Sequence, residues 1–180
     1  MLDLAKFTAD AHQNAVDHGW WEGERKIDGL LALIHSEWSE ALESYRNHEP
    51  MVWYREKDGH QKPEGFAVEL IDGCIRIFDL LGYLEAPMHE VRYDERLHDV
   101  ESRRVEMDEE MLIATCHLYT SQAYRELKEG YKIDAMATLV ARVLIIFDWL
   151  HERGIDYEAI LLEKHEYNQS RPYKHGGKRI

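Results

Sequence analysis

Cysteines and long apolar runs are scarce in this sequence, and each scarcity excludes a class of protein. The chain has two cysteines in 180 residues, Cys74 and Cys116, without metal-type spacing, which is typical of a reducing cytoplasm. The longest nearly apolar stretch, 135–150, contains Arg142 and Asp148 and is too short to span a bilayer. The first ten residues carry two acids, unlike the basic start of a signal peptide. We therefore expect a cytoplasmic protein that does not enter a membrane.

Basic residues are also fewer than acidic ones. Lys and Arg number 22 against 35 Asp and Glu, so the formal net charge is −13. Because such a chain repels the phosphate backbone, nucleic acid is not an expected partner. The basic residues gather late, since 164–180 hold five Lys or Arg and one acid, Glu166. With 44% hydrophobic residues, the chain is apolar enough to form a globular core.

Alternating, strand-like patterns are scarce, whereas helical periodicity recurs along the chain. Gly19, Gly82, Gly130 and Gly154 end periodic segments, as glycine commonly does at helix C-termini. The sequence predicts helices at 3–18, 27–45, 62–82, 109–129, 133–152 and 156–169. Between them lie a polar loop, 48–61, and a charged connector, 85–108, with room for one short helix. The predicted fold class is all-α.

Two helix pairs of the chain resemble each other. Leu30, Ala32, His35, Ser39 and Ala41 recur as Leu112, Ala114, His117, Ser121 and Ala123, and the Ile-Phe-Asp-x-Leu motif of 77–81 recurs at 146–150. We interpret these matches as an internal duplication; the alternative is a chance likeness between amphipathic helices. The predicted architecture is a four-helix-type core made from two related helix pairs plus flanking helices. The single domain, 1–180, then comprises a catalytic helix unit (1–84), the connector (85–108), a degenerate second pair (109–154) and a C-terminal helix with a basic tail (155–180).

Two pairs of carboxylates carry the chemistry of the first helix pair. Glu37 and Glu40 lie three residues apart on one predicted helix, and Glu69 and Asp72 on another, so each pair projects from one face. Glu37 also belongs to an otherwise apolar stripe, where a carboxylate is costly unless it is paired or bound to metal. Four such charges on adjacent antiparallel helices call for a divalent cation, and all-oxygen ligands favour Mg²⁺ or Mn²⁺ over Zn²⁺. The alternative is a solvated helix face, because acids are common on helices.

The second helix pair lacks these acids. The corresponding positions hold Tyr119, Gln122, Thr138 and Ala141, while the apolar pattern persists. We therefore expect one active unit and one that has lost its site. The second pair would complete the core and wall the pocket without binding metal, and a homodimer through other surfaces is left open.

A longer signature contains these acids. It consists of Glu37-x-x-Glu40, a gap of 28 residues and Glu69-x-x-Asp72, together with Gly-Trp-Trp at 19–21, Ile-Arg-Ile-Phe-Asp at 75–79 and Glu-Lys-His-Glu-Tyr-Asn-x-x-Arg at 163–171. It resembles the signature of the all-α nucleoside triphosphate pyrophosphohydrolases, the MazG-like group that includes the dCTP pyrophosphatases and the dimeric dUTPases. The resemblance covers 1–84 and 155–180, and the gap is at the long end of the family's range.

The resemblance implies an enzyme that hydrolyses a nucleoside triphosphate, with a deoxynucleoside triphosphate as the first candidate, to a monophosphate and pyrophosphate. In that family four acids, here Glu37, Glu40, Glu69 and Asp72, hold Mg²⁺ on the triphosphate. Glu37 and Glu40 are the candidate catalytic residues, because one of them would position the attacking water. The candidate substrate-binding residues are Lys164, Asn168, Arg171, Trp21 and His12.

Two other functions stay open from the sequence. A catalytically weak, nucleotide-binding pseudo-enzyme or interaction module would keep the helices, although a purely structural protein would not need the four acids. A carboxylate-bridged di-iron bundle needs two Glu-x-x-His motifs on core helices. The candidate, Glu95-x-x-His98, lies in the charged connector, which argues against di-iron chemistry.

Overall fold

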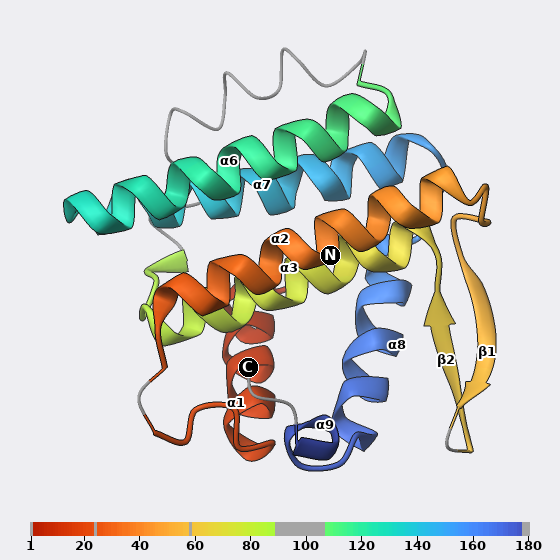
Figure 1. Cartoon of the computed structure of the whole chain (residues 1–180), viewed down its shortest axis with the longest axis horizontal. Helices are drawn as coiled ribbons and strands as arrows, with labels where there is room; N and C mark the ends of the chain where they lie inside the picture. Colours follow the sequence, from red (N-terminus) through yellow and green to blue (C-terminus); the bar gives the residue numbers. More distant parts are fainter. Residues whose placement is uncertain (1, 24, 58, 89–106, 178–180) are drawn as a thin grey trace.

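The structure, a computed structural model, describes residues 2–23, 25–57, 59–88 and 107–177 (Figure 1). Its elements in chain order are α1 (Leu4–Asp17), α2 (Ile27–Arg46), β1 (Trp53–Lys57), β2 (His60–Glu64), α3 (Phe66–Tyr83), α6 (Glu109–Glu129), α7 (Lys132–Glu152), α8 (Tyr157–Ser170) and the short α9 (Lys174–Gly177). This mostly helical architecture confirms the predicted all-α class, with one small two-stranded sheet added. Within the described ranges, no helix is both long enough and apolar enough to cross a membrane.

Four long helices form the centre of the fold. α2 packs on α3, α6 packs on α7, and the two pairs stack through α2 on α6 and α3 on α7. In Figure 1 these four helices run side by side, and α1 and α8 cross beneath them. α3 is the most central helix, because it also contacts α1, α8 and β2. One hydrophobic core runs through both pairs and includes Trp38 of α2, Ile71 of α3, Leu112 of α6 and Leu150 of α7.

Local sequence explains where the helices begin and end. The side chains of Asp3, Asp108 and Asp156 accept hydrogen bonds from first-turn backbone N–H groups of α1, α6 and α8. Gly130 ends α6 with φ +87°, a left-handed conformation that glycine adopts without strain. The predicted helices other than that at 62–82 agree with the observed ones to within a residue at each end. The short helix expected within 85–108 falls largely outside the described residues.

The segment before α3 differs from the prediction. Residues 53–57 and 60–64 pair as an antiparallel hairpin, so the loop expected at 48–61 and the helix start expected at 62–64 are wrong over this stretch. Pro63 fits in β2 because both strands of a two-stranded sheet are edge strands. Gly65, with φ +113°, then turns the chain into α3. Figure 1 shows the hairpin standing beside α8.

Matching residues of the two helix pairs touch each other. Three such contacts are His35–His117, Trp38–Thr120 and Phe78–Phe147. The first two partners are separated by 82 residues, the offset that aligns α2 with α6. Contacts between equivalent positions are expected where two units are related by a two-fold axis. They favour the interpretation of the chain as an internal duplication whose halves pack as a dimer would.

Two leucines of α6 test whether the second helix pair is an internal packing partner. Leu112 is fully buried, whereas Leu118 is 61% exposed. We expect Leu112→Ala to lower the unfolding free energy by about 2–5 kcal/mol, because it leaves a cavity in the shared core. Leu118→Ala should change it by less than about 0.5 kcal/mol. Urea unfolding measures both, and equal effects of the two substitutions would contradict this packing.

Candidate active site

Three of the predicted metal ligands converge between α2 and α3. Carboxylate oxygens of Glu37, Glu40 and Glu69 all lie within 4.8 Å of one another. α2 supplies the first two and α3 the third, because the i, i+3 spacing places each acid on the face that meets the other helix. Glu37 is 4% exposed and Glu69 8%, whereas Glu40 faces solvent. We call Glu37, Glu40 and Glu69 the acidic triad.

Asp72, the fourth predicted ligand, lies beside the triad with a partner of its own. Lys164 of α8 places its Nζ 2.7 Å from Asp72 Oδ2. This lysine is 2% exposed, and the same Nζ lies 3.4 Å from the carbonyl oxygen of Pro63. The structure therefore brings Lys164, a predicted substrate-binding residue, to the acids. There it compensates part of their charge.

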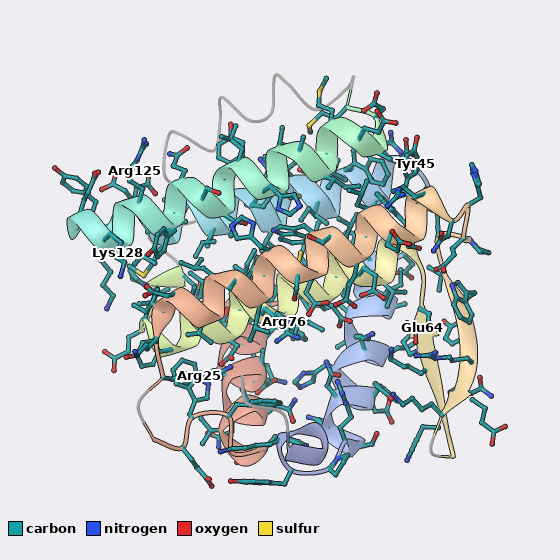
Figure 2. All side chains as sticks on the ribbon, in the orientation of Figure 1. Arg25, Tyr45, Glu64, Arg76, Arg125 and Lys128 are labelled. Carbon is teal, nitrogen blue, oxygen red and sulfur yellow. The ribbon has the colours of Figure 1, made fainter. Side chains whose placement is uncertain are left out.

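Arg76 is a site residue that the sequence reasoning missed. It lies one turn after Asp72 on α3, and its guanidinium Nε donates a hydrogen bond to Glu37 Oε1. Figure 2 shows Arg76 at the centre of the molecule, near the middle of α3. The signal in the sequence was its i, i+4 spacing from Asp72, which places a cation on the acid-bearing face of the helix.

Crowding and burial change the protonation of the triad. Burial raises the pKa of Glu37 to about 7; the Arg76 guanidinium opposes this rise, and the neighbouring carboxylates of Asp72 and Glu40 add to it. Burial, followed by Asp72, raises the pKa of Glu69 to about 8. In the absence of a cation, both groups therefore hold a proton over part of the neutral range. A divalent cation bound here would favour the ionised carboxylates, and oxygen donors are the ligands that Mg²⁺ prefers.

A pocket of about 100 Å³ adjoins the triad. It is lined by Ala11, Asn14, Ala15, His18, Trp20, Arg25, Glu37, Asp72, Ile75, Arg76, Asp79, Asn168 and Arg171. Glu37 and Asp72 join the pocket to the acids, and three arginines line it together with these two carboxylates and Asp79. Asn168 and Arg171, two of the predicted substrate-binding residues, reach it from α8 and the residue after that helix.

The other two predicted substrate-binding residues, His12 and Trp21, are absent from the pocket lining. His12 Nδ1 and Trp21 Nε1 each donate to Asp79 Oδ1 at 2.8 Å. Trp21 also stacks on Tyr83, with ring centroids 4.4 Å apart. The neighbouring Trp20 lines the pocket instead. His12 and Trp21 therefore contact the pocket wall through Asp79, and their role in substrate binding stays a prediction.

The corresponding positions of the second pair form a different network. Gln122 and Thr138 both donate hydrogen bonds to Glu126, at 2.8 and 2.9 Å. The guanidinium of Arg142 lies over the ring of Tyr119, 4.4 Å from its centroid. Within the described ranges, no acidic triad forms between α6 and α7. That the second pair has lost its site stays a prediction.

No family model, curated protein or solved structure matches the chain. The chemistry open to the site therefore follows from its own groups. The acidic triad can hold a divalent cation, and the arginines and Asn168 of the adjoining pocket can bind anionic and polar parts of a ligand. A ligand that uses both is an anion that also chelates metal, which describes a phosphate ester.

The raised pKa values predict how stability depends on pH without metal. Between about pH 5 and 8 the folded state keeps protons on Glu37 and Glu69 that the unfolded chain releases. Their contribution to the unfolding free energy therefore falls as pH rises through this range. A change of about 1 kcal/mol in the unfolding free energy shifts Tm by roughly 2–4 °C in a domain of this size. We therefore expect Tm to fall by several degrees between pH 5 and 8.

Thermal melting in EDTA from pH 5 to 8 measures this dependence. Glu69→Gln removes one of the two carboxyl groups with a raised pKa, so Tm should depend less steeply on pH in this variant. Glu43→Gln, at an exposed position of α2, should leave that dependence unchanged. Identical slopes in the wild type and Glu69→Gln would contradict the raised pKa of Glu69.

Proposed function

We propose that this chain is a metal-dependent nucleoside triphosphate pyrophosphohydrolase of the MazG-like kind. The observation that carries the proposal is the acidic triad, in which Glu37 and Glu69 are buried and Glu37 also lines a pocket with cationic and amide side chains. The resemblance of the Glu37–Asp72 signature to that family supports the same reaction. The proposed products are a nucleoside monophosphate and pyrophosphate.

The triad is the proposed metal-binding centre. Glu37, Glu40 and Glu69 would hold Mg²⁺, with Mn²⁺ as an alternative, and Asp72 would join them if Lys164 moved to the phosphates. When bound, the cation would neutralise phosphate charge and lower the pKa of an attacking water. The two glutamates of α2 can orient that water by accepting its hydrogen bonds, and Glu40 is the one that solvent reaches.

The pocket is the proposed nucleoside end of the site. Trp20 offers an aromatic face for a base, and Asn168 offers an amide that can both donate and accept. Arg171 lines the pocket and interacts electrostatically with Asp72 and Glu37, while its guanidinium makes no ion pair within 4.0 Å with any described residue. It is therefore available to bind a phosphate oxygen. Arg76 borders the same region and would share that role while it holds Glu37.

One contact favours a second candidate function. The ion pair between Lys164 and Asp72 occupies the carboxylate that the family signature assigns to metal. A site held in this state would bind a nucleotide and turn it over weakly or not at all, as a pseudo-enzyme or interaction module. Single-turnover measurements with excess protein separate the two functions, because an enzyme yields pyrophosphate and a binding module yields an unchanged nucleotide.

A matched pair of substitutions on α2 tests the reaction. Glu40→Gln removes a triad carboxylate at an exposed position, and Glu43→Gln removes a carboxylate from the same helix outside the triad. We expect Glu40→Gln to lower Mg²⁺-dependent pyrophosphate release by roughly 100-fold or more, with unchanged helix content. Glu43→Gln should retain wild-type turnover. Full activity in Glu40→Gln would refute the metal assignment.

A further inference from the structure

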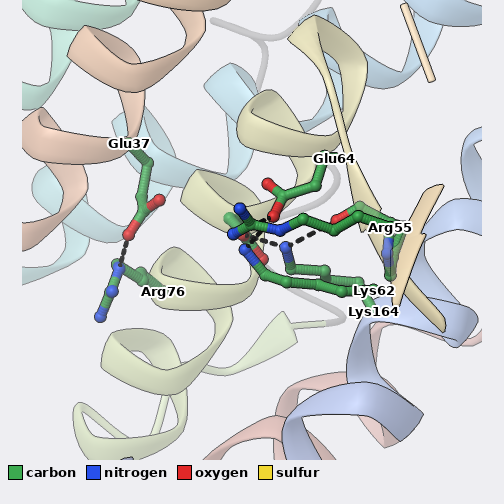
Figure 3. A network of polar contacts seen from close by, with 8 residues as sticks. Glu37, Arg55, Lys62, Glu64, Arg76 and Lys164 are labelled. Carbon is green, nitrogen blue, oxygen red and sulfur yellow. Dashed lines mark hydrogen bonds and ion pairs between the residues drawn. The ribbon is translucent and has the colours of Figure 1, made fainter. Parts of the chain in front are cut away.

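The hairpin missed by the sequence analysis carries cations to the far end of the acidic site. Arg55 of β1 and Lys62 of β2 are direct cross-strand partners. Arg55 Nη2 lies 2.6 Å and Lys62 Nζ 2.5 Å from the same oxygen, Glu64 Oε1. Lys164 connects this group to the triad side, because its Nζ contacts both the Pro63 carbonyl and Asp72. Figure 3 shows the three cationic side chains converging beside Glu64.

Two hairpin cations, Arg55 and Lys62, share one carboxylate, that of Glu64. Like charges directly opposite each other destabilise a strand pair, and one carboxylate, Glu64, offsets two of them here. Lys164 cannot be counted as spare, because Asp72 is its partner. Among the described residues, Glu64 is the carboxylate that pairs with both Arg55 and Lys62, so this pair carries one more positive charge than Glu64 offsets, together with several N–H donors. The Arg55 side chain is 49% exposed, so a ligand can reach it.

The hairpin and the pocket lie at opposite ends of the same line of residues. In Figure 2, Arg25 of the pocket, Arg76 and then Glu64 of the hairpin follow one another across the molecule. On α3, Glu69 lies three residues closer to the hairpin than Asp72, which is about 4.5 Å along the helix. A ligand with its nucleoside in the pocket and a phosphate at the triad would extend its outer phosphates toward Arg55 and Lys62.

We propose that Arg55 and Lys62 bind the terminal phosphate of the substrate, so that the hairpin selects triphosphates over diphosphates. This inference rests on the proposed function and assigns its specificity for phosphate chain length. A diphosphate would fill the pocket and reach the metal but leave the hairpin cations without their ligand. Each charge-assisted hydrogen bond gained by the third phosphate is worth about tenfold in affinity or more.

Binding of nucleotides that resist cleavage tests the proposal independently of turnover. The probes are the α,β-imido analogues of the four common deoxynucleoside triphosphates and the matching α,β-imido diphosphates, titrated calorimetrically in Mg²⁺. The variant is Arg55→Gln combined with Lys62→Gln. The control is Lys57→Gln, which removes a positive charge from the exposed end of β1, away from Glu64.

We expect the wild type and Lys57→Gln to bind the triphosphate analogue at least about tenfold more tightly than the diphosphate. The double variant should lose that preference and keep its affinity for the diphosphate. If it keeps the wild-type ratio of affinities, the hairpin assignment is overturned and the proposed function stands. If the wild type binds none of the analogues, the proposed function fails, and this inference fails with it.

Discussion

Negative charge buried between two packed helices is the constraint on which the rest of this structure depends. Glu37 and Glu69 are nearly excluded from water, and a third carboxylate lies within 4.8 Å of them. Uncompensated charges in such a place cost several kcal/mol each. Arg76 pairs with Glu37 and Lys164 with Asp72, and burial raises the pKa of Glu37 and of Glu69, so that these two groups keep protons when no cation is bound. Burying these carboxylates costs folding free energy, so packing alone does not explain their position.

The second helix pair stabilises the fold through packing, and its corresponding positions do not hold acids. It contributes α6 and α7 to the common core, and it contacts the first pair through equivalent residues such as Phe78 and Phe147. Where the first pair holds acids, the second holds Gln122 and Thr138, both hydrogen-bonded to Glu126. The second pair thus contributes packing, and the acids of the proposed site belong to the first pair.

Much of this arrangement was predictable from periodicity and spacing. Helix positions followed from the apolar period and its glycine breaks, and the i, i+3 spacing of the acids predicted that Glu37, Glu40 and Glu69 would meet. Those signals are local, because each depends on residues within a few turns of one helix. The ion pair of Lys164 with Asp72 joins residues far apart in the chain, and nothing in the local pattern of either helix specifies it.

The errors have physical causes as well. The Lys-Pro-Glu at 62–64 is typical of a helix start, yet the Asp-Gly at 58–59 between two short segments was the stronger indication of a hairpin. The two adjacent tryptophans follow a turn at Gly19, whose φ is +74°, and Trp20 is the one that lines the pocket. Trp21 instead supports Asp79. Backbone turns of this kind reverse side-chain directions and leave no periodic signal.

We propose that this site cleaves a nucleoside triphosphate between its first and second phosphates with a divalent cation. The most direct measurement is phosphorus NMR of the four common deoxynucleoside triphosphates incubated with the protein, with Mg²⁺ or with EDTA. We expect equimolar nucleoside monophosphate and pyrophosphate from at least one nucleotide, in Mg²⁺ only. Release of orthophosphate and a nucleoside diphosphate, or the same products in EDTA, would contradict it.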